Sequence, residues 1–382
     1  MRFFNGCFIF IFVLILTLPL VFIDLKSDRI SVTENRMLAN PPSLSEINKY
    51  PEIFIRQFDE WFKDSTGFRE KMLIIYKVFI EKWINNGISQ YTDGQYVYLV
   101  GENGHHYFAN VGGWMISKFQ GKKFLSDEQL SGMARKLEKV KTYLDKEKIP
   151  LVVMFCADKE SVYPEFYPKS IKSGPEPIQL DIITNYLQEN TNVDIFNIRQ
   201  ALLAEKNNYL LYYKIDTMAF TSAFAHYNEI GAFFAYSELM KHINKYFTQI
   251  IPYTTDDIEI NYDEKEIPHV TLKSGFTYQK LDLSFFDDVN VHKPFTWQNS
   301  AYENKNLNLP VILILCDSYA AEHFINKYIA QHFGEAIFIH YSNAGNIKEY
   351  INQFKPDIVV FESAERALGD FANYVIGIPE LR

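Results

Sequence analysis

The hydrophobic positions of this chain change period several times, between the spacing of helices and that of buried strands. Val311 to Cys316 is an unbroken apolar run of six residues that is rich in β-branched side chains. The run is too short to cross a membrane, so we predict a fully buried strand. The next stretch, Ala320 to Phe333, has apolar side chains at helical spacing and ends at Gly334, which predicts a helix. Ser318 therefore lies in a predicted turn between a strand and a helix.

The same alternation of strand and helix patterns recurs on both sides of this turn. The predicted strands are 151–155, 193–196, 210–213, 336–340 and 357–361, and the predicted helices are 126–144, 178–189, 199–206, 228–246 and 347–354. Strands that alternate with helices form parallel sheets through right-handed crossovers. The pattern therefore predicts an α/β fold with a parallel sheet flanked by helices.

Three segments depart from this alternation. Residues 51–88 have helical spacing and many aromatic side chains, which indicates a packed helical segment. Tyrosine-rich alternating runs between residues 90 and 113 predict short hairpins. Residues 250–308 contain further short alternating runs, so we predict a β-rich insertion there.

The N-terminus has the pattern of a membrane segment. Cys7 to Ile23 contains seventeen residues without a charge, enough to cross a bilayer as a helix at about 1.5 Å per residue. No small-residue cleavage motif precedes the charged stretch Asp24 to Arg29, so we predict a signal anchor rather than a cleaved signal peptide. The predicted organisation is a single transmembrane anchor at 1–26, a linker at 27–50 and one domain at 51–382, which would lie in the periplasm or outside the cell.

Composition narrows the possible functions. The 382 residues include 38 basic and 47 acidic ones, a formal net charge of −9, and form no basic stripe, which argues against a nucleic-acid partner. The three cysteines do not make a disulfide framework, because Cys7 lies in the apolar N-terminal run and Cys156 and Cys316 end predicted strands. His105 and His106 are adjacent and would face opposite sides of a strand, so we predict no metal site and no cofactor.

A serine after a buried strand has two interpretations. Asp317 or Ser318 caps the following helix, or the hydroxyl is a nucleophile at the carboxyl end of a parallel sheet, where open α/β sheets bind ligands. A nucleophilic serine needs a base and a group that orients the base. Asp216 follows a predicted strand and His226 precedes a predicted helix, so both lie in loops that a parallel sheet brings to the same edge. The alternative is that His226 is structural.

The block Cys316-Asp317-Ser318-Tyr319 resembles the Gly-Asp-Ser nucleophile block of SGNH-type hydrolases, and the chain is similar to the alginate O-acetyltransferase family typified by AlgJ and AlgX. In this family the Asp and His block precedes the serine block, as it does here. The segments that carry the similarity are Glu34 to Arg36, Phe58 to Phe62 with Asp64, Gly67 to Arg69, Asp158 to Glu165 with Pro168, Tyr212 to Lys214, Asp216-Thr217, His226 with Gly231-Ala232, Lys355 to Val360 and Glu365-Arg366.

The resemblance implies an extracytoplasmic enzyme that accepts an acetyl group on Ser318 and passes it to a hydroxyl of an exported polysaccharide. A membrane-bound O-acyltransferase would supply the acetyl group. Ser318 would be the nucleophile, His226 the general base and then acid, and Asp216 the group that holds the imidazole tautomer.

Three further residues are candidates for substrate binding. Arg366 would bind an anionic oxygen or a sugar acid, and its alternative is a structural ion pair with Glu362 or Glu365. Asn343 and Gly345 follow a predicted strand and are candidate oxyanion donors.

One departure from the family pattern bears on the triad. The family places a single residue between the acid and the base, whereas eight residues, Met218 to Ala225, appear here where the histidine is expected to follow Thr217. Either this loop bulges outward and returns His226 to Asp216, or the triad is broken. The hypotheses are thus an acetyltransferase, an acetylesterase with the same triad, and a membrane-anchored scaffold that binds the acyltransferase or the polymer without chemistry.

Overall fold

The chain divides into two compact units, Met1–Ser89 and Gln90–Arg382. The main sheet lies in the second unit, and the predicted domain bounds 51–382 stay a prediction. The computed structural model describes residues 30–31, 36–43, 51–66, 90–93, 96–109, 114–214, 226–263, 267–282, 299–320 and 325–381, with the single residues 17, 23, 47 and 286.

The first unit contains a short strand pair and one helix. Strands β1 (Ile30–Ser31) and β2 (Arg36–Met37) pair antiparallel, and α2 (Pro51–Ser65) carries a row of aromatic rings around Phe58. None of the described helices is long and apolar enough to span a bilayer. The predicted anchor at 1–26 lies outside the described residues except for Thr17 and Ile23, so it stays a prediction.

The second unit is built on a seven-stranded sheet with the order β10-β11-β13-β12-β14-β6-β7. The five strands from β13 to β7 run parallel, and β10 and β11 are antiparallel at one edge. The strands are β6 (Leu151–Cys156), β7 (Asp194–Asn197), β10 (Tyr278–Lys280), β11 (Ser300–Asn304), β12 (Val311–Cys316), β13 (Glu335–His340) and β14 (Ile358–Ala364).

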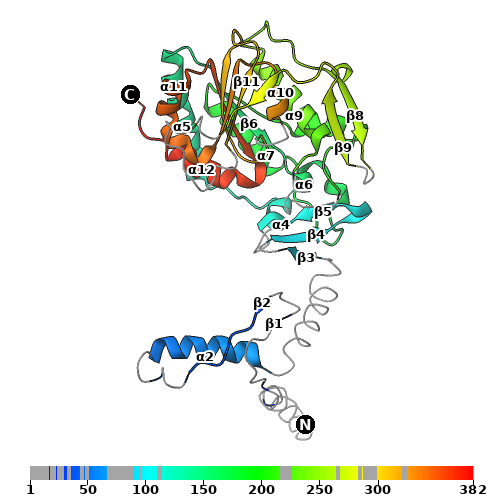
Figure 1. Ribbon diagram of the computed structural model, residues 1–382, viewed down its shortest axis with the longest axis vertical. Coiled ribbons are helices and arrows are strands. Elements are labelled where there is room, and N and C mark those ends of the chain that lie inside the picture. Colours follow the sequence, from blue (N-terminus) through cyan, green and yellow to red (C-terminus); the bar gives the residue numbers. More distant parts are fainter. Residues whose placement is uncertain are drawn as a thin grey trace. The chain divides into compact units, whose positions relative to one another are not determined.

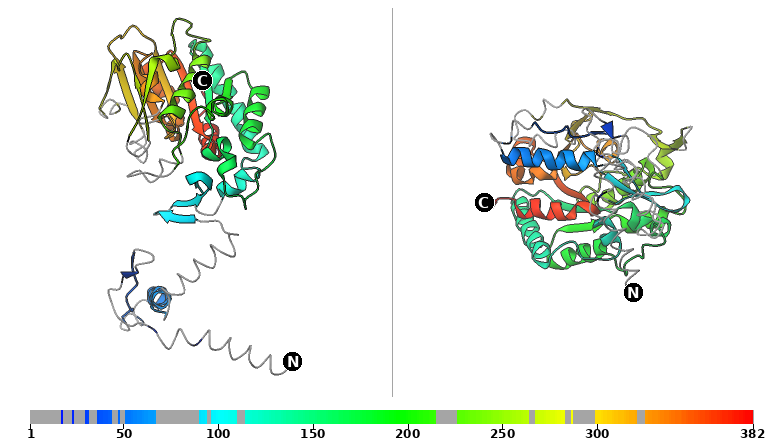
Figure 2. Two further views of the ribbon diagram at one scale, coloured as in Figure 1. Left: turned by 90° about the vertical axis from the view of Figure 1, so that its right-hand side faces the viewer. Right: turned by 90° about the horizontal axis from the view of Figure 1, so that it is seen from below.

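The expectation of a purely parallel sheet is therefore wrong at that edge. The predicted insertion at 250–308 supplies β10 and β11 to the sheet, as well as a separate hairpin of β8 (Ile258–Tyr262) and β9 (Pro268–Leu272). Figure 2 shows the yellow and orange strands of this part of the chain at one end of the sheet. An antiparallel edge strand needs no crossover helix, so the helix and strand alternation carried no sign of it.

A second correction concerns the predicted strand 210–213. Its only described sheet contact is an isolated bridge between Tyr212 and Tyr227. Leu211 is buried because α9 packs closely on the segment, with a Cβ at Gly231 falling 2.3 Å from the Leu211 carbonyl oxygen. The apolar run therefore marked burial under a helix rather than strand pairing.

Helices cover both faces of the sheet. Figure 1 shows α5 and α12 packed together on one side and α9 on the other. The predicted helix 320–333 appears in the described residues only as the short α10. The helices are α4 (Trp114–Phe119), α5 (Asp127–Lys146), α6 (Lys159–Val162), α7 (Gln179–Asn190), α8 (Arg199–Glu205), α9 (Glu229–Ile243), α10 (Asn326–Ile329), α11 (Ile347–Phe354) and α12 (Leu368–Ile376). Short 3-10 turns are η3 (Glu102–Gly104), η4 (Pro164–Phe166), η6 (Thr255–Asp257), η9 (Tyr341–Asn346) and η10 (Glu365–Ala367).

The predicted hairpins at 90–113 are present as a three-stranded antiparallel sheet of β3 (Gln90–Asp93), β4 (Tyr96–Val100) and β5 (His106–Phe108). The sheet is bonded to the rest of the unit by the His106 amide, which donates to the Lys214 carbonyl oxygen at 2.8 Å. The buried Lys159 ammonium donates to the carbonyl oxygens of His106 and Tyr213 at 2.7 and 2.6 Å. This small sheet therefore packs beside the segment that precedes Asp216 in the sequence.

We expect the centre of β12 to be the most sensitive part of the core. Leu313 is fully buried between β13 and β14, so Leu313→Ala should lower the free energy of unfolding by about 2 to 5 kcal/mol. Leu307→Ala is the control, because that side chain is 63% exposed and should change stability by less than about 0.5 kcal/mol. Urea denaturation of the full chain measures both, and equal midpoints for the two variants would contradict this account of the core.

Candidate active site

Ser318 is placed by a turn that is bonded to the neighbouring strand. The Asp317 carboxyl oxygens accept hydrogen bonds from the amides of Tyr319 at 2.9 Å and Ala364 at 2.8 Å. The Asp317 amide in turn donates to Glu362 Oε2 at 3.1 Å. Burial raises the pKa of the Asp317 carboxyl, and the two amide bonds partly oppose that rise. Asp317 thus connects the ends of β12 and β14, which leaves the partly exposed Ser318 hydroxyl at the carboxyl edge of the sheet.

His226 lies against this serine. Its Nε2 atom is 2.8 Å from Ser318 Oγ, and its ring packs on Tyr319 with the centroids 4.7 Å apart. The backbone after His226 is fixed by the α9 cap, where Asn228 Oδ1 accepts hydrogen bonds from the amides of Ile230 and Gly231. The structure therefore brings together two of the three predicted triad residues.

The third predicted member, Asp216, lies outside the described residues, as do Met218 to Ala225. Its role as the carboxylate that orients His226 stays a prediction.

Arg366 lies beside the serine and histidine. It follows β14 in η10, and its NH1 group donates to Asp158 Oδ1 at 2.7 Å and to the Tyr319 hydroxyl at 3.0 Å. Its NH2 group is 3.3 Å from His226 Nε2. We predicted Glu362 or Glu365 as the partners for a structural ion pair, but the carboxylate that holds Arg366 is Asp158. The reason is geometric, because the ends of β6 and β14 are paired side by side in register.

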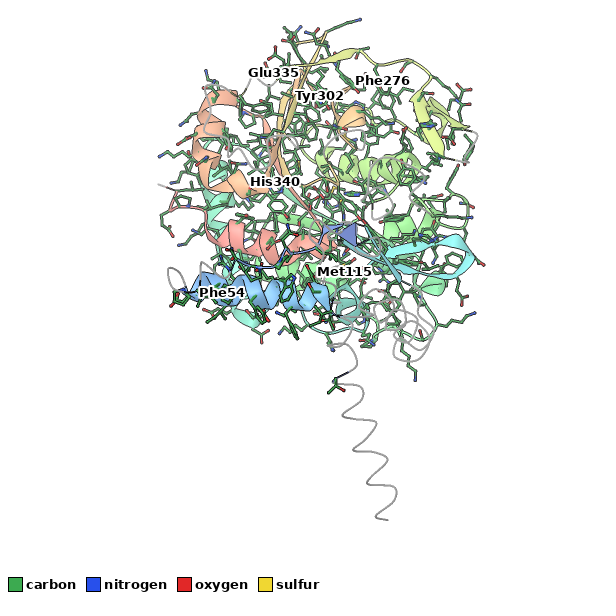
Figure 3. All side chains as sticks on the ribbon, turned by 60° about the horizontal axis from the view of Figure 1, so that its bottom comes forward. Phe54, Met115, Phe276, Tyr302, Glu335 and His340 are labelled. Carbon is green, nitrogen blue, oxygen red and sulfur yellow. The ribbon has the colours of Figure 1, made fainter. Side chains whose placement is uncertain are left out.

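Asn343 and Gly345 lie in η9, after β13. Figure 3 labels both ends of that strand, Glu335 at one edge of the sheet and His340 at the edge where β12 also ends. The Asn343 side-chain amide donates to the His340 carbonyl oxygen at 3.2 Å, and a Cβ placed on Gly345 would lie 3.9 Å from Pro379 Cδ. Their role as oxyanion donors stays a prediction.

Asp158, the partner of Arg366, belongs to a group of buried charged side chains. The ammonium of Lys118 contacts Asp158 Oδ2 at 2.5 Å, Glu160 Oε1 at 3.0 Å and Glu365 Oε1 at 3.3 Å. Burial alone would raise the pKa of Asp158, but Lys118 and Arg366 together lower it below its ordinary value. Burial raises the pKa of Glu160 to about 7, against the opposing charge of Lys118 and with the neighbouring acids Asp158 and Glu365 adding to the rise. Asp158 is therefore a carboxylate clamped between two cations.

Asp158 and Tyr319 contact Arg366 but were not among the predicted site residues, although the sequence carried a signal for Asp158. Asp158, Ser318 and Arg366 each stand two residues after the last residue of a parallel strand, and β6, β14 and β12 are consecutive in the sheet. Residues at equivalent positions beyond neighbouring parallel strands emerge at the same edge. Comparing these strand ends would have grouped the three residues.

The described residues contain no group of three histidine, cysteine or acidic side chains placed to hold a metal ion. Cys156 and Cys316 are free and buried. Burial raises the pKa of both thiols well above the ordinary value, so they are core residues and not nucleophiles.

The fold and the site define an α/β protein of the SGNH hydrolase-like class. A model of the ALGX family, described as "SGNH hydrolase-like domain, acetyltransferase AlgX", matches residues 112–261. This match over residues 112–261 confirms the resemblance to the AlgJ and AlgX group for that segment. The match contains His226 and ends before Ser318 and Arg366, so those two residues are placed by the structure alone.

Two solved structures share the fold at low sequence identity, and a third matches with a lower TM-score. Bacillus cereus PatB1 with a sulfonyl adduct has a TM-score of 0.51 and 14% identity, covering 74% of this chain and 97% of that one. A DHHW family protein from Eubacterium siraeum has a TM-score of 0.50 and 13% identity, covering 76% and 97%. The O-acetyltransferase domain of Pseudomonas putida AlgJ has a TM-score of 0.44 and 13% identity, covering 73% and 98%. No curated protein matches the sequence significantly.

We expect Asp317→Asn to reduce the reactivity of Ser318, and to do so more than a loss of stability alone would. An amide offers one acceptor where Asp317 offers two, so one buried backbone amide loses its partner, at a cost of about 1 to 3 kcal/mol. Asp357→Asn is the matched control, because Asp357 Oδ2 accepts from the Val311 amide at 2.7 Å at the opposite end of β12. Urea midpoints measure the stability of both variants, and the rate of 4-nitrophenolate release from 4-nitrophenyl acetate measures the reactivity of Ser318. Only Asp317→Asn should lose that reactivity. Equal losses of reactivity in the two variants would contradict this role.

Proposed function

We propose that this protein is a serine O-acyltransferase that moves an acetyl group through Ser318 to a hydroxyl of an exported or cell-surface polysaccharide. The observation that supports the proposal is the 2.8 Å contact between His226 Nε2 and Ser318 Oγ. That distance is within the range in which an imidazole removes a hydroxyl proton. The family match to the AlgX acetyltransferase domain supports acetyl as the group transferred.

The reaction would proceed in two half-reactions. As Ser318 Oγ attacks the acetyl carbonyl carbon, its proton moves to His226 Nε2, and the carbonyl oxygen becomes an oxyanion. Collapse of this intermediate breaks the bond to the leaving group, which takes the proton from Nε2. A sugar hydroxyl then attacks the acetyl-serine, gives its proton to Nε2, and Ser318 regains a proton on release of the acetylated sugar.

Each remaining predicted residue has a role in this scheme. Asp216 would accept a hydrogen bond from His226 Nδ1 and fix the tautomer with Nε2 free of hydrogen. Arg366 would stabilise the oxyanion or bind an anionic group of the acceptor, since its guanidinium contacts the same ring nitrogen as Ser318. Asn343 and Gly345 would add oxyanion donors from η9.

The cellular arrangement belongs to the same proposal. The uncharged run from Cys7 to Ile23 would hold the protein in the membrane, with the catalytic unit in the periplasm or outside the cell. A membrane-bound O-acyltransferase would then supply the acetyl group, and the polysaccharide would be the acceptor.

The test is the covalent intermediate. Incubating the full chain with 4-nitrophenyl acetate should add the mass of one acetyl group, and peptide mapping should place it on Ser318. Ser318→Ala should abolish the adduct, and His226→Ala should lower its rate of formation by at least about a hundredfold. His242→Ala is the control, because His242 contacts Asp194 at 2.8 Å away from Ser318 and should acetylate normally. An undiminished adduct in Ser318→Ala would overturn the proposal.

The fate of the acetyl group separates the transferase from an acetylesterase. Addition of an unacetylated oligosaccharide to the acetyl-enzyme should give an O-acetylated sugar, whereas an esterase gives only acetate. The non-catalytic scaffold required Ser318 and His226 to be far apart, so the short distance between them weighs against it.

A further inference from the structure

We propose that Asp158 is a positioning residue that holds Arg366 so that its NH2 group acts first on His226 and then on the oxyanion that forms on the acetyl carbonyl oxygen as Ser318 attacks. This inference rests on the proposed function and assigns a role to the buried charges behind the site. Asp158 would touch neither substrate nor the reacting atoms. It would act through Arg366 and through the Tyr319 hydroxyl, which donates to Asp158 Oδ1 at 3.2 Å and also holds Arg366 NH1.

The contacts divide the guanidinium between two tasks. NH1 is taken by Asp158 Oδ1 and by the Tyr319 hydroxyl, and the guanidinium carbon lies 4.8 Å from the centroid of the Tyr319 ring. NH2 is then directed to His226 Nε2 at 3.3 Å, the same atom that faces Ser318 Oγ at 2.8 Å. The planar guanidinium fixes the direction of NH2 once NH1 is held.

Asp158 is itself immobilised. It is fully buried, its Oδ2 contacts Lys118 at 2.5 Å, and its backbone amide donates to Glu365 Oε2 at 3.0 Å. Both carboxylate oxygens are therefore bonded, one to each cation. A carboxylate held in this way fixes the guanidinium more firmly than an exposed surface partner would.

The geometry makes the hydrogen bond from NH2 depend on the progress of the reaction. Before attack, Nε2 has a lone pair that accepts from both the serine hydroxyl and the guanidinium. After Nε2 has taken the serine proton it has no lone pair left, so an NH2 hydrogen is released beside the new oxyanion. An interaction that strengthens only as charge develops lowers the barrier rather than the substrate dissociation constant.

The same arrangement places a cation beside the catalytic base. A positive charge next to an imidazole disfavours its protonated form, and a carboxylate behind that charge opposes the effect. Arg366 and Asp158 should therefore shift the titration of His226 in opposite directions. Among the described residues, the other charged and titratable groups around the pair are Lys118 on α4, Glu160 on α6, Tyr212 in the segment before Lys214, Asp317 and Tyr319 after β12, Glu362 on β14 and Glu365 on η10.

The experiment compares Asp158→Asn and Arg366→Gln by the pH dependence of kcat/KM for 4-nitrophenyl acetate, whose acidic limb reports the base of the free enzyme. Arg366→Gln should lower kcat by about a hundredfold or more and move the acidic limb to higher pH. Asp158→Asn should lower kcat up to about a hundredfold and move that limb to lower pH. In both variants KM should change little.

Opposite shifts of the acidic limb in the two variants support the inference, because a loss of packing alone would not move the limb to lower pH in one variant and to higher pH in the other. Shifts in the same direction, or unchanged limbs in folded variants, would overturn it. If Asp158→Asn does not fold, Asp158→Glu serves instead: it keeps the charge of the acid and displaces the guanidinium from His226 Nε2, so it should lower kcat and move the acidic limb to higher pH, as Arg366→Gln does. A limb that moves to lower pH, or an unchanged kcat, in Asp158→Glu would contradict the inference.

Asp194→Asn is the control for replacing an acid that contacts basic groups, because Asp194 contacts His242 at 2.8 Å and Lys245 at 2.9 Å at the start of β7. Its rate and pH profile should equal those of the wild type. The test also separates the inference from the proposed function. If the wild type forms no acetyl-Ser318, the proposed function fails. If it does and the variants lack opposite shifts, only the role of Asp158 fails.

Discussion

The site depends on hydrogen bonds that join the ends of neighbouring parallel strands. These bonds lie where the backbone pairing of the strands ends. The Ala364 amide donates to Asp317 and the Asp317 amide donates to Glu362, which joins the ends of β14 and β12. The Asp158 amide donates to Glu365, which joins the ends of β6 and β14. Each bond satisfies a buried backbone amide with a carboxyl oxygen from the adjacent strand end. These bonds fix three consecutive turns relative to one another, so the side chains two residues beyond each strand are held at defined separations.

The cost of this arrangement is a concentration of buried acids. Asp158, Glu160, Asp317, Glu362 and Glu365 are all buried near two cations, Lys118 and Arg366. Desolvation raises the pKa of Glu362 and Glu365 and brings that of Glu160 to about 7, while Asp158 alone is lowered. Charge is therefore kept on the acid that contacts Arg366, and the others take up protons more readily because ionisation in a low-dielectric interior is expensive.

Much of the fold followed from hydrophobic periodicity. The predicted strand Val311 to Cys316 is β12 residue for residue, and the predicted helix 126–144 corresponds to α5, Asp127–Lys146. Local patterns of this kind report which face of an element is buried, and they do so reliably for central strands. These patterns gave the wrong result in two places. At 210–213 the residues are buried by α9 and not by strand pairing. At β10 and β11 the alternating runs predicted strands, but such runs do not distinguish an antiparallel edge of the main sheet from a separate hairpin.

For the site, the sequence by itself determined the chemistry available: a serine after a buried strand, a histidine before a helix, and a family resemblance that linked them. It did not determine that Asp158 holds Arg366, because residues 208 positions apart meet only through the pairing of β6 with β14. Nor did it decide that Tyr319 and Arg366 share the space around His226. Strand order and register are collective properties of the packed sheet, so the partners of each charge were decided by the tertiary structure.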